Sequence, residues 1–344
     1  MSRRILSLCF PTCNRKEKLI ATVRTLLACP DNRFSITISD NVSTDDTVRE
    51  LKDIKDDRLC VFSLDKKVPA YENYNQVIQF ANSEYVLHVL DKECINPQYL
   101  TDFLDFLESE QPNFGLVDIF GKNDTERFIL YQKGIESIQN GGGGGDTHPS
   151  GFYYKKSLYE VEYKRISSII EGGNLWVLDI VSAGLGAQYD SIVYYKPLVS
   201  YNKSVILSGK TMSPYTHKTI YWYGGMRVAS LMLFVKSIKS LELINAQNKE
   251  IILYSILERH LLNMIWTQIN FFKDEYRCSH YGLKTCNIGI IESVRWIIVM
   301  IYSFCKEVGS SIPLKFSKLL SPFIKGLLTA IKQTHPNILL LVRK

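Results

Sequence analysis

The sequence lacks a long apolar run. Its most hydrophobic stretch covers the seven residues 296–302, whereas a helix that spans a membrane needs roughly 20 residues. The N-terminal residues carry a short apolar run that Pro11 closes, without the small-residue cleavage site of a secretory signal. The eight cysteines are scattered and form no CxxC pair, which argues against zinc ligation and a disulfide framework. We therefore expect reduced thiols in a cytoplasmic protein.

The sequence also lacks a strong compositional bias. It is 46% hydrophobic, 22% charged and 12% aromatic, which excludes disorder, collagen and coiled coil for the whole chain. Its 344 residues predict two domains, or one large domain with an appendage. The net charge of +6 hides an asymmetry: residues 1–209 hold 23 basic against 28 acidic side chains, and residues 210–344 hold 18 against 7. The second part predicts a partner with negative charge, such as nucleic acid, anionic lipid or a phosphorylated substrate.

Short apolar runs alternate with helical periodicity in the first 90 residues. The predicted strands and helices of this region, in chain order, are residues 5–10, 16–28, 34–39, 45–55, 59–64, 71–81 and 85–90. Ser43 or Thr44 is the expected N-cap of the second helix. This alternation predicts an α/β fold with a Rossmann-like, mostly parallel sheet and helices on both faces.

After the first 90 residues, the regular alternation of predicted strands and helices ends. Five consecutive glycines at residues 141–145 predict a mobile loop, because a packed element does not tolerate their backbone entropy. Further predicted strands and helices are residues 152–154, 176–185, 191–195, 226–240, 249–272, 290–305 and 313–332. The last of these has an apolar stripe, with lysines off it at 318, 325 and 332.

Polar residues follow three of the predicted strands, at residues 11–15, 40–46 and 91–93. Ligands of such sheets bind beyond the carboxyl ends of the strands. The carboxylates at 91–93 could hold a divalent cation, or they could mark a solvated strand end. The carboxylate at 40 could accept a hydrogen bond from a base or a ribose, or it could be a turn residue. The helix start after 11–15 could bind an anion, or one of these residues could simply be its N-cap. Neither GxGxxG nor a P-loop motif is present.

With their spacings, the segments ILSLCFPTCNR, ITISDNVSTDDT and EYVLHVLDKE resemble family 2 of the inverting glycosyltransferases over about residues 4–205. The resemblance implies a GT-A fold, the fold of nucleotide-diphospho-sugar transferases. It implies a catalytic domain at residues 1–215, with a nucleotide-binding half of about 1–95 and an acceptor half of about 96–215. Residues 216–344 would then form a basic, helical C-terminal region.

The resemblance also implies roles for single residues. Thr12 and Asp40 would hold the base, and Asp91 with Glu93 would hold Mn²⁺ or Mg²⁺ on the sugar diphosphate. The other nucleotide-binding residues that it implies are Pro11, Asn14, Arg15, Asn41 and Asn73. Glu93 departs from the second Asp of the family's "DxD" motif, and Lys92 lies between the two carboxylates.

The acceptor half carries the implied catalytic base, Asp179. The family has a Glu-Asp pair there, and Leu178 replaces the Glu. A helix cap or a surface ion pair is the structural alternative for Asp179. The residues expected to line the acceptor or diphosphate pocket are His148, Ser150, Gly151, Trp176 and His217. A turn, a core tryptophan and a solvated loop are the respective alternatives for His148, Trp176 and His217.

The implied function is metal-dependent, inverting transfer of a hexose from a nucleotide-sugar donor, in the first instance a UDP-sugar. The acceptor would be a glycan or a lipid-linked saccharide in the synthesis of a surface polysaccharide, such as lipopolysaccharide O-antigen or capsule. Two alternatives stay open: a sugar nucleotidyltransferase, and a non-catalytic glycan-binding or scaffold subunit with the same fold. The first needs a Gly-rich basic loop where PTCNRK stands.

The basic C-terminal region has two interpretations. It is either a helical bundle with a solvated basic face, or an interfacial surface that binds anionic lipid on the cytoplasmic face of the inner membrane. Nucleic acid is disfavoured as a partner, because the first part is acidic and no DNA or RNA recognition motif is present.

Overall fold

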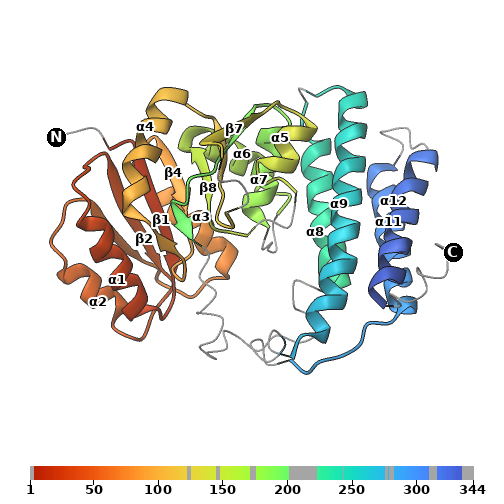
Figure 1. Ribbon diagram of the computed structural model, residues 1–344, viewed down its shortest axis with the longest axis horizontal. Helices are drawn as coiled ribbons and strands as arrows, with labels where there is room; N and C mark the ends of the chain where they lie inside the picture. The colour runs from red at the N-terminus through yellow and green to blue at the C-terminus, as the bar shows by residue number, and fades with distance from the viewer. Residues whose placement is uncertain are drawn as a thin grey trace. The chain divides into compact units, whose positions relative to one another are not determined.

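The computed structural model describes residues 4–121, 125–144, 148–170, 176–200, 223–242, 244–275, 278, 283–309 and 316–334. The chain divides into two compact units. The first comprises Met1–Gly143 with Thr147–Val205, and the second comprises Gly144–Asp146 with Ile206–Lys344. Figure 1 shows a sheet with helices in the first unit and long helices in the second. The expected domain boundary at residue 215 lies outside the described residues.

The described part of the first unit contains an eight-stranded sheet of order β3-β2-β1-β4-β8-β6-β9-β7. The strands are β1 (Leu6–Thr12), β2 (Phe34–Asp40), β3 (Leu59–Ser63), β4 (Tyr85–His88), β6 (Phe114–Val117), β7 (Phe128–Tyr131), β8 (Phe152–Lys155) and β9 (Ser191–Tyr194). Strands β1 to β4 are mutually parallel. Because β8 is antiparallel to both β4 and β6, strands β6 and β9 point the same way as β1. The predicted α/β fold with a mostly parallel sheet is confirmed.

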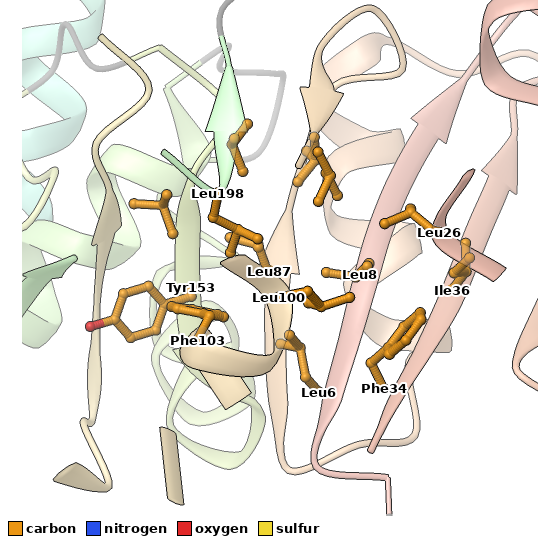
Figure 2. Packing of buried hydrophobic residues seen from close by; sticks show 14 of the residues in the cluster. Leu6, Leu8, Leu26, Phe34, Ile36, Leu87, Leu100, Phe103, Tyr153 and Leu198 are labelled. Carbon is orange, nitrogen blue, oxygen red and sulfur yellow. The ribbon is translucent and has the colours of Figure 1, made fainter. Parts of the chain in front are cut away.

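Seven helices of the first unit are described, of which most have one buried face, whereas α7 is buried on all sides. They are α1 (Lys16–Leu27), α2 (Thr47–Asp53), α3 (Ala70–Phe80), α4 (Leu100–Glu110), α5 (Ile135–Asn140), α6 (Lys156–Ile166) and α7 (Val177–Gly186), with a 3-10 turn η1 (Pro97–Tyr99) before α4. In α1 the buried residues Leu19, Val23 and Leu26 recur at helical spacing. Figure 2 shows Leu8 of β1, Leu87 of β4 and other apolar residues in one continuous core.

The prediction of a mobile glycine loop is wrong for the glycines that the structure describes. Gly141, Gly142 and Gly143 are buried directly after α5. A Cβ atom at Gly143 would lie 2.6 Å from Cα of Ala183 in α7, and Gly142 has a φ of 96°. The glycines are therefore a packing feature: without side chains, this segment can approach α7 closely.

The segment that follows β4 forms a small two-stranded sheet with the end of the first unit. Strand β5 (Cys94–Ile95) pairs antiparallel with β10 (Val199–Ser200). The N–H of Asn96 also donates a 2.7 Å hydrogen bond to the carbonyl of Leu198. The end of the first unit is thereby tied to the chain just after Glu93.

The described helices of the second unit are α8 (Gly224–Lys239), α9 (Ala246–Lys273), α11 (Ile290–Val308) and α12 (Phe316–Thr334). Helix α9 contacts both α8 and α12, and α11 contacts α8 and α12 (Figure 1). None of the helices in the described part of the chain combines the length and the apolar character needed to cross a bilayer.

Candidate functional site

The candidate site lies at the edge of the sheet where β1 and β4 end side by side. The strands after β1 run outward on one side, and β4 lies on the other, so the strand order reverses here, and ligands of open α/β sheets bind at such points. Thr12 pairs in register with Asp40, and the Thr12 hydroxyl donates a 2.8 Å hydrogen bond to Oδ2 of Asp91. The structure therefore brings together three residues at the ends of three separate strands, with Thr12 and Asp40 closing β1 and β2 and Asp91 following β4.

Asp40 presents a buried carboxylate oxygen at this edge. The residue is 1% exposed, and its Oδ2 accepts a 2.9 Å hydrogen bond from the N–H of Ser43. Within the described part of the chain, the buried Oδ1 has no hydrogen-bond partner. Leaving a buried acceptor unsatisfied costs roughly 1–3 kcal/mol. A ligand N–H or hydroxyl that reached Oδ1 would remove this cost.

Asn14 ties two loops of the site together. It has a φ of 54°, its N–H donates to Oγ of Ser43 at 2.8 Å, and its Oδ1 accepts from the N–H of Thr44 at 2.7 Å. The predicted capping of the second helix by Ser43 or Thr44 is wrong. The N-cap residue of α2 is Asp46, whose side chain makes no capping hydrogen bond, and the carboxylate of the preceding Asp45 accepts the N–H of Thr47 at 3.2 Å.

The other two asparagines of the predicted nucleotide site also hold backbone. Asn41 donates to the carbonyl of Val68 at 2.7 Å and accepts its N–H at 2.9 Å. Asn73 in α3 donates to the carbonyl of Ser39 at 3.1 Å and accepts its hydroxyl at 2.6 Å. Because both amides are engaged in this way, we expect them to position the loops around a nucleotide.

Asp91 and Glu93 follow β4 as a pair of carboxylates. Burial raises the pKa of Asp91, against the lowering effects of the Thr12 hydrogen bond and the charge of Arg15. Glu93 is fully buried, and its Oε1 lies 3.5 Å from Nε2 of His148. Both side chains offer the hard oxygen donors that Mg²⁺ and Mn²⁺ prefer.

These donors fit a metal that is completed by its substrate. Among the residues that the structure describes, no group of three or more histidine, cysteine or carboxylate side chains could hold a metal ion. Mg²⁺ typically binds through one or two carboxylates together with substrate phosphates and water. Asp91 and Glu93 match that pattern, because they supply two carboxylates and leave the other ligand positions to phosphate oxygens and water.

Basic side chains surround the two carboxylates. Arg15 occupies the N-cap of α1, after Pro11 at the buried end of β1. Lys18, one turn into α1, donates a hydrogen bond to the backbone carbonyl of Lys92. Burial lowers the pKa of both lysines, while the nearby carboxylates raise it. The sequence analysis noted Lys92 between the two carboxylates without giving it a role, and it did not single out Lys18, for which a lysine in the first turns of a helix that starts at the site was the available signal.

The segment around His148 reaches the same edge of the sheet. The hydroxyl of Ser150 accepts the N–H of Leu90 at 2.9 Å, and the N–H of Ser150 donates to Nδ1 of His148 at 3.2 Å. Burial lowers the pKa of His148 to about 3, so its ring is neutral at pH 7. Because Nδ1 accepts, the proton is on Nε2, which faces Glu93. Gly151 completes the turn with a φ of 98°.

Asp179 lies in the first turn of α7 and is 2% exposed. Helix α7 precedes β9 in the chain, and the hydroxyl of Tyr154 in β8 donates a 3.1 Å hydrogen bond to the carbonyl of Leu178, directly before Asp179. Burial, with a contribution from the charge of Asp179, raises the pKa of Tyr154. Trp176 is buried at the N-cap of α7, which favours packing over stacking on a sugar. His217 lies outside the described residues.

Two residues that the sequence analysis did not assign follow β6 at the same edge. Phe120 is 54% exposed, and its ring lies edge-on to His148 with centroids 6.2 Å apart. Asp118 is buried, and its Oδ1 accepts the N–H of Phe120 at 3.0 Å. The apolar run that forms β6, followed by Asp-Ile-Phe, was the signal that could have found them.

Comparison with known proteins agrees with this geometry. Residues 7–163 match the family model described as glycosyl transferase family 2. No match is found among curated proteins. The structure is similar to that of S. aureus TarS residues 1–349, with a TM-score of 0.61, 16% identity and coverage of 96% of this chain and 90% of that chain.

Two further TarS structures are similar. One is the same segment in complex with UDP-GlcNAc, with a TM-score of 0.58, 17% identity and coverage of 96% of this chain and 90% of that one. The other is a longer TarS chain, with a TM-score of 0.60 and 16% identity; the match covers 95% of this chain and 55% of that one. At such identities the likeness defines the fold.

The sheet and the likeness to TarS define a GT-A-like fold. Residues 7–163, somewhat less than half of the chain, are similar to glycosyl transferase family 2. Both conclusions agree with the resemblance of the three sequence segments.

Proposed function

We propose that the protein transfers a sugar from a UDP-sugar, with inversion, to a glycan or lipid-linked acceptor of a surface polysaccharide. The observation that carries this proposal is the meeting of Thr12, Asp40 and Asp91 at the switch point of the sheet. The choice of UDP is supported by the TarS structures in complex with UDP and UDP-GlcNAc. The surface-polysaccharide role is an inference by analogy with the family.

In the donor site, different residues bind the nucleoside and the diphosphate. The unsatisfied Oδ1 of Asp40 accepts a hydrogen bond from the base or the ribose. Arg15, Lys18 and Lys92 bring positive charge toward the diphosphate. Asp91 and Glu93 would hold Mn²⁺ or Mg²⁺, which supplies Lewis-acid stabilisation of the leaving diphosphate when bound.

Inversion requires a base on the acceptor side of the sugar. Asp179 takes the proton of the acceptor hydroxyl as that oxygen attacks C1 from the face opposite the diphosphate. Its burial in the first turn of α7, at the place in the sequence where the family has its Glu-Asp pair, supports this role. The neutral His148, with Nε2 directed at Glu93, adds no further charge beside that carboxylate.

A ligand screen by thermal shift tests the donor. UDP with Mn²⁺ is expected to raise the melting temperature more than GDP, CDP or dTDP, and more than UDP with EDTA. A ligand at 100 times its Kd adds about 2.7 kcal/mol to the free energy of unfolding. Asp40→Asn is expected to weaken UDP binding by about tenfold or more, because a charged hydrogen bond is lost.

The matched control for this screen is Asp53→Asn, which alters an exposed carboxylate at the end of α2 and should leave the UDP shift intact. A preference for another base would overturn the UDP assignment. Binding of UDP without turnover of any UDP-sugar with Mn²⁺ would favour the scaffold alternative.

Phe120 is expected to form part of the acceptor site. Replacing Phe120 by alanine should raise the acceptor KM about tenfold, because a sugar face loses an aromatic platform of favourable geometry. Phe120→Trp keeps such a platform and should stay near the wild-type value. Initial rates at varied acceptor, with donor hydrolysis measured in parallel, check this. An equal loss of donor hydrolysis in Phe120→Ala would contradict a role confined to the acceptor.

A further inference from the structure

Helix α12 packs with its smallest residues inward. Pro322, Gly326 and Ala330 are buried at a spacing of four residues. A Cβ atom at Gly326 would lie 2.6 Å from Cδ2 of Leu261 in α9. Small residues at such a seam allow two helices to approach closely, as they do in helix pairs within membranes.

The opposite face of α12 is apolar and open. Leu320, Ile324 and Leu328 are 46%, 45% and 49% exposed. They lie two residues away from the buried positions, which is about 200° around a helix. An ordinary helix of a water-soluble protein buries its large aliphatic residues and exposes polar ones; α12 reverses this arrangement.

Helix α11 adds a second open apolar stripe. Ile291, Ile298 and Tyr302 are 84%, 54% and 67% exposed, and their spacing of seven and four residues puts them on one face. The other face is already buried through residues such as Met300 and Phe304. Because α11 also contacts α12, the two stripes belong to neighbouring helices.

The exposed charged residues described on these two helices are basic, although Arg295 forms a 3.6 Å ion pair with the half-buried Glu292. Among the described residues of α11 and α12, the exposed positions include Arg295, Lys306, Lys325 and Lys332 but no aspartate or glutamate. The acidic residues of α9 that contact α12 are paired, Glu250 with Lys318 and Glu258 with Lys325. Two of the three lysines at seven-residue spacing, Lys318 and Lys325, therefore lie against α9.

We propose that the open faces of α11 and α12 bind the headgroup region of an anionic membrane. Aliphatic residues flanked by basic ones suit that environment, because the acyl boundary takes the apolar side chains and anionic lipids attract the basic ones. A second copy of this chain fits less well, since a two-fold contact would place basic residues against basic residues. The inference goes beyond the proposed function and does not depend on the donor.

Sedimentation of the full chain with lipid vesicles tests the proposal. The protein is expected to co-sediment with vesicles of phosphatidylglycerol and phosphatidylcholine, less with phosphatidylcholine alone, and less at high salt. Ile324→Ser and Leu328→Ser should each lower the partition coefficient about tenfold, because each removes an aliphatic group from the interface.

Leu130→Ser and Val161→Ser are the matched controls, because both residues are exposed aliphatics of the first unit. They should bind vesicles like the wild type. Unchanged melting temperature and donor hydrolysis in all four variants would show intact folding and an intact donor site. Vesicle binding that Ile324→Ser and Leu328→Ser leave unchanged would overturn the proposal. So would a dimer in light scattering that these two variants dissociate, because a second copy would then cover the face.

Discussion

Replacing Asp91 by asparagine is expected to lower sugar transfer on the order of 10³-fold, the scale of losing one preorganised electrostatic group at the reacting phosphates. The variant keeps the shape of the side chain and an oxygen for the Thr12 hydroxyl, which now donates at 2.8 Å. It removes the negative charge that would help to hold Mn²⁺ or Mg²⁺. Initial rates with a UDP-sugar at varied metal concentration measure the effect.

The same variant separates a functional from a structural role for Asp91. Burial raises the pKa of this carboxyl above its ordinary 3.8, so its charged form destabilises the folded state at pH 7. Asp91→Asn should therefore melt at the same temperature as wild type or higher at pH 7. The difference should vanish below about pH 4, where the carboxyl is protonated in both states. A lower melting temperature with parallel loss of activity would indicate a structural residue instead.

Asp179→Asn is expected to lower kcat by about 10²–10⁴-fold, the usual contribution of a general base. Donor binding should stay unchanged, because the acceptor proton is the group that Asp179 is proposed to take. Thermal shift with UDP and Mn²⁺ measures donor binding, and single-turnover transfer measures the chemical step.

Asp118→Asn is the informative comparison, because Asp118 is also buried and ends β6 at the same edge of the sheet. If Asp118→Asn abolished transfer while Asp179→Asn retained it, the role of base would pass to Asp118. Full transfer activity in both variants would contradict a role for either Asp179 or Asp118 as the base.

The meeting of Thr12, Asp40 and Asp91 could be predicted because parallel strands end at one edge of a sheet. Each residue directly follows an apolar run, so its place on the edge depends only on local periodicity. For the residues after β6, the apolar run marks the end of a strand but not the edge of the sheet at which that strand ends. Phe120 and Asp118 reach the edge only because the antiparallel β8 lies between β4 and β6, and that pairing has no local sequence signal.

For the glycine run, the prediction of a mobile loop is wrong at the described glycines. Composition alone predicts a mobile backbone for such a segment, because each glycine loses more entropy on folding than any other residue. Gly143 is nevertheless buried against Ala183, forty residues later in the chain. Close approach between distant backbones is a property of the packed fold, and propensity does not report it.

The sequence by itself determined the alternating strands and helices, the mostly parallel sheet and the polar edge of its first half, because each depends on residues close together in the chain. Only the tertiary structure decided which distant residues the side chains of each helix, strand or loop contact. It placed the neutral His148 against Glu93, used Asn14 to join two loops, and turned the aliphatic side of α12 outward. Periodicity gives an apolar stripe on a helix, but contacts between distant segments decide whether that stripe is covered.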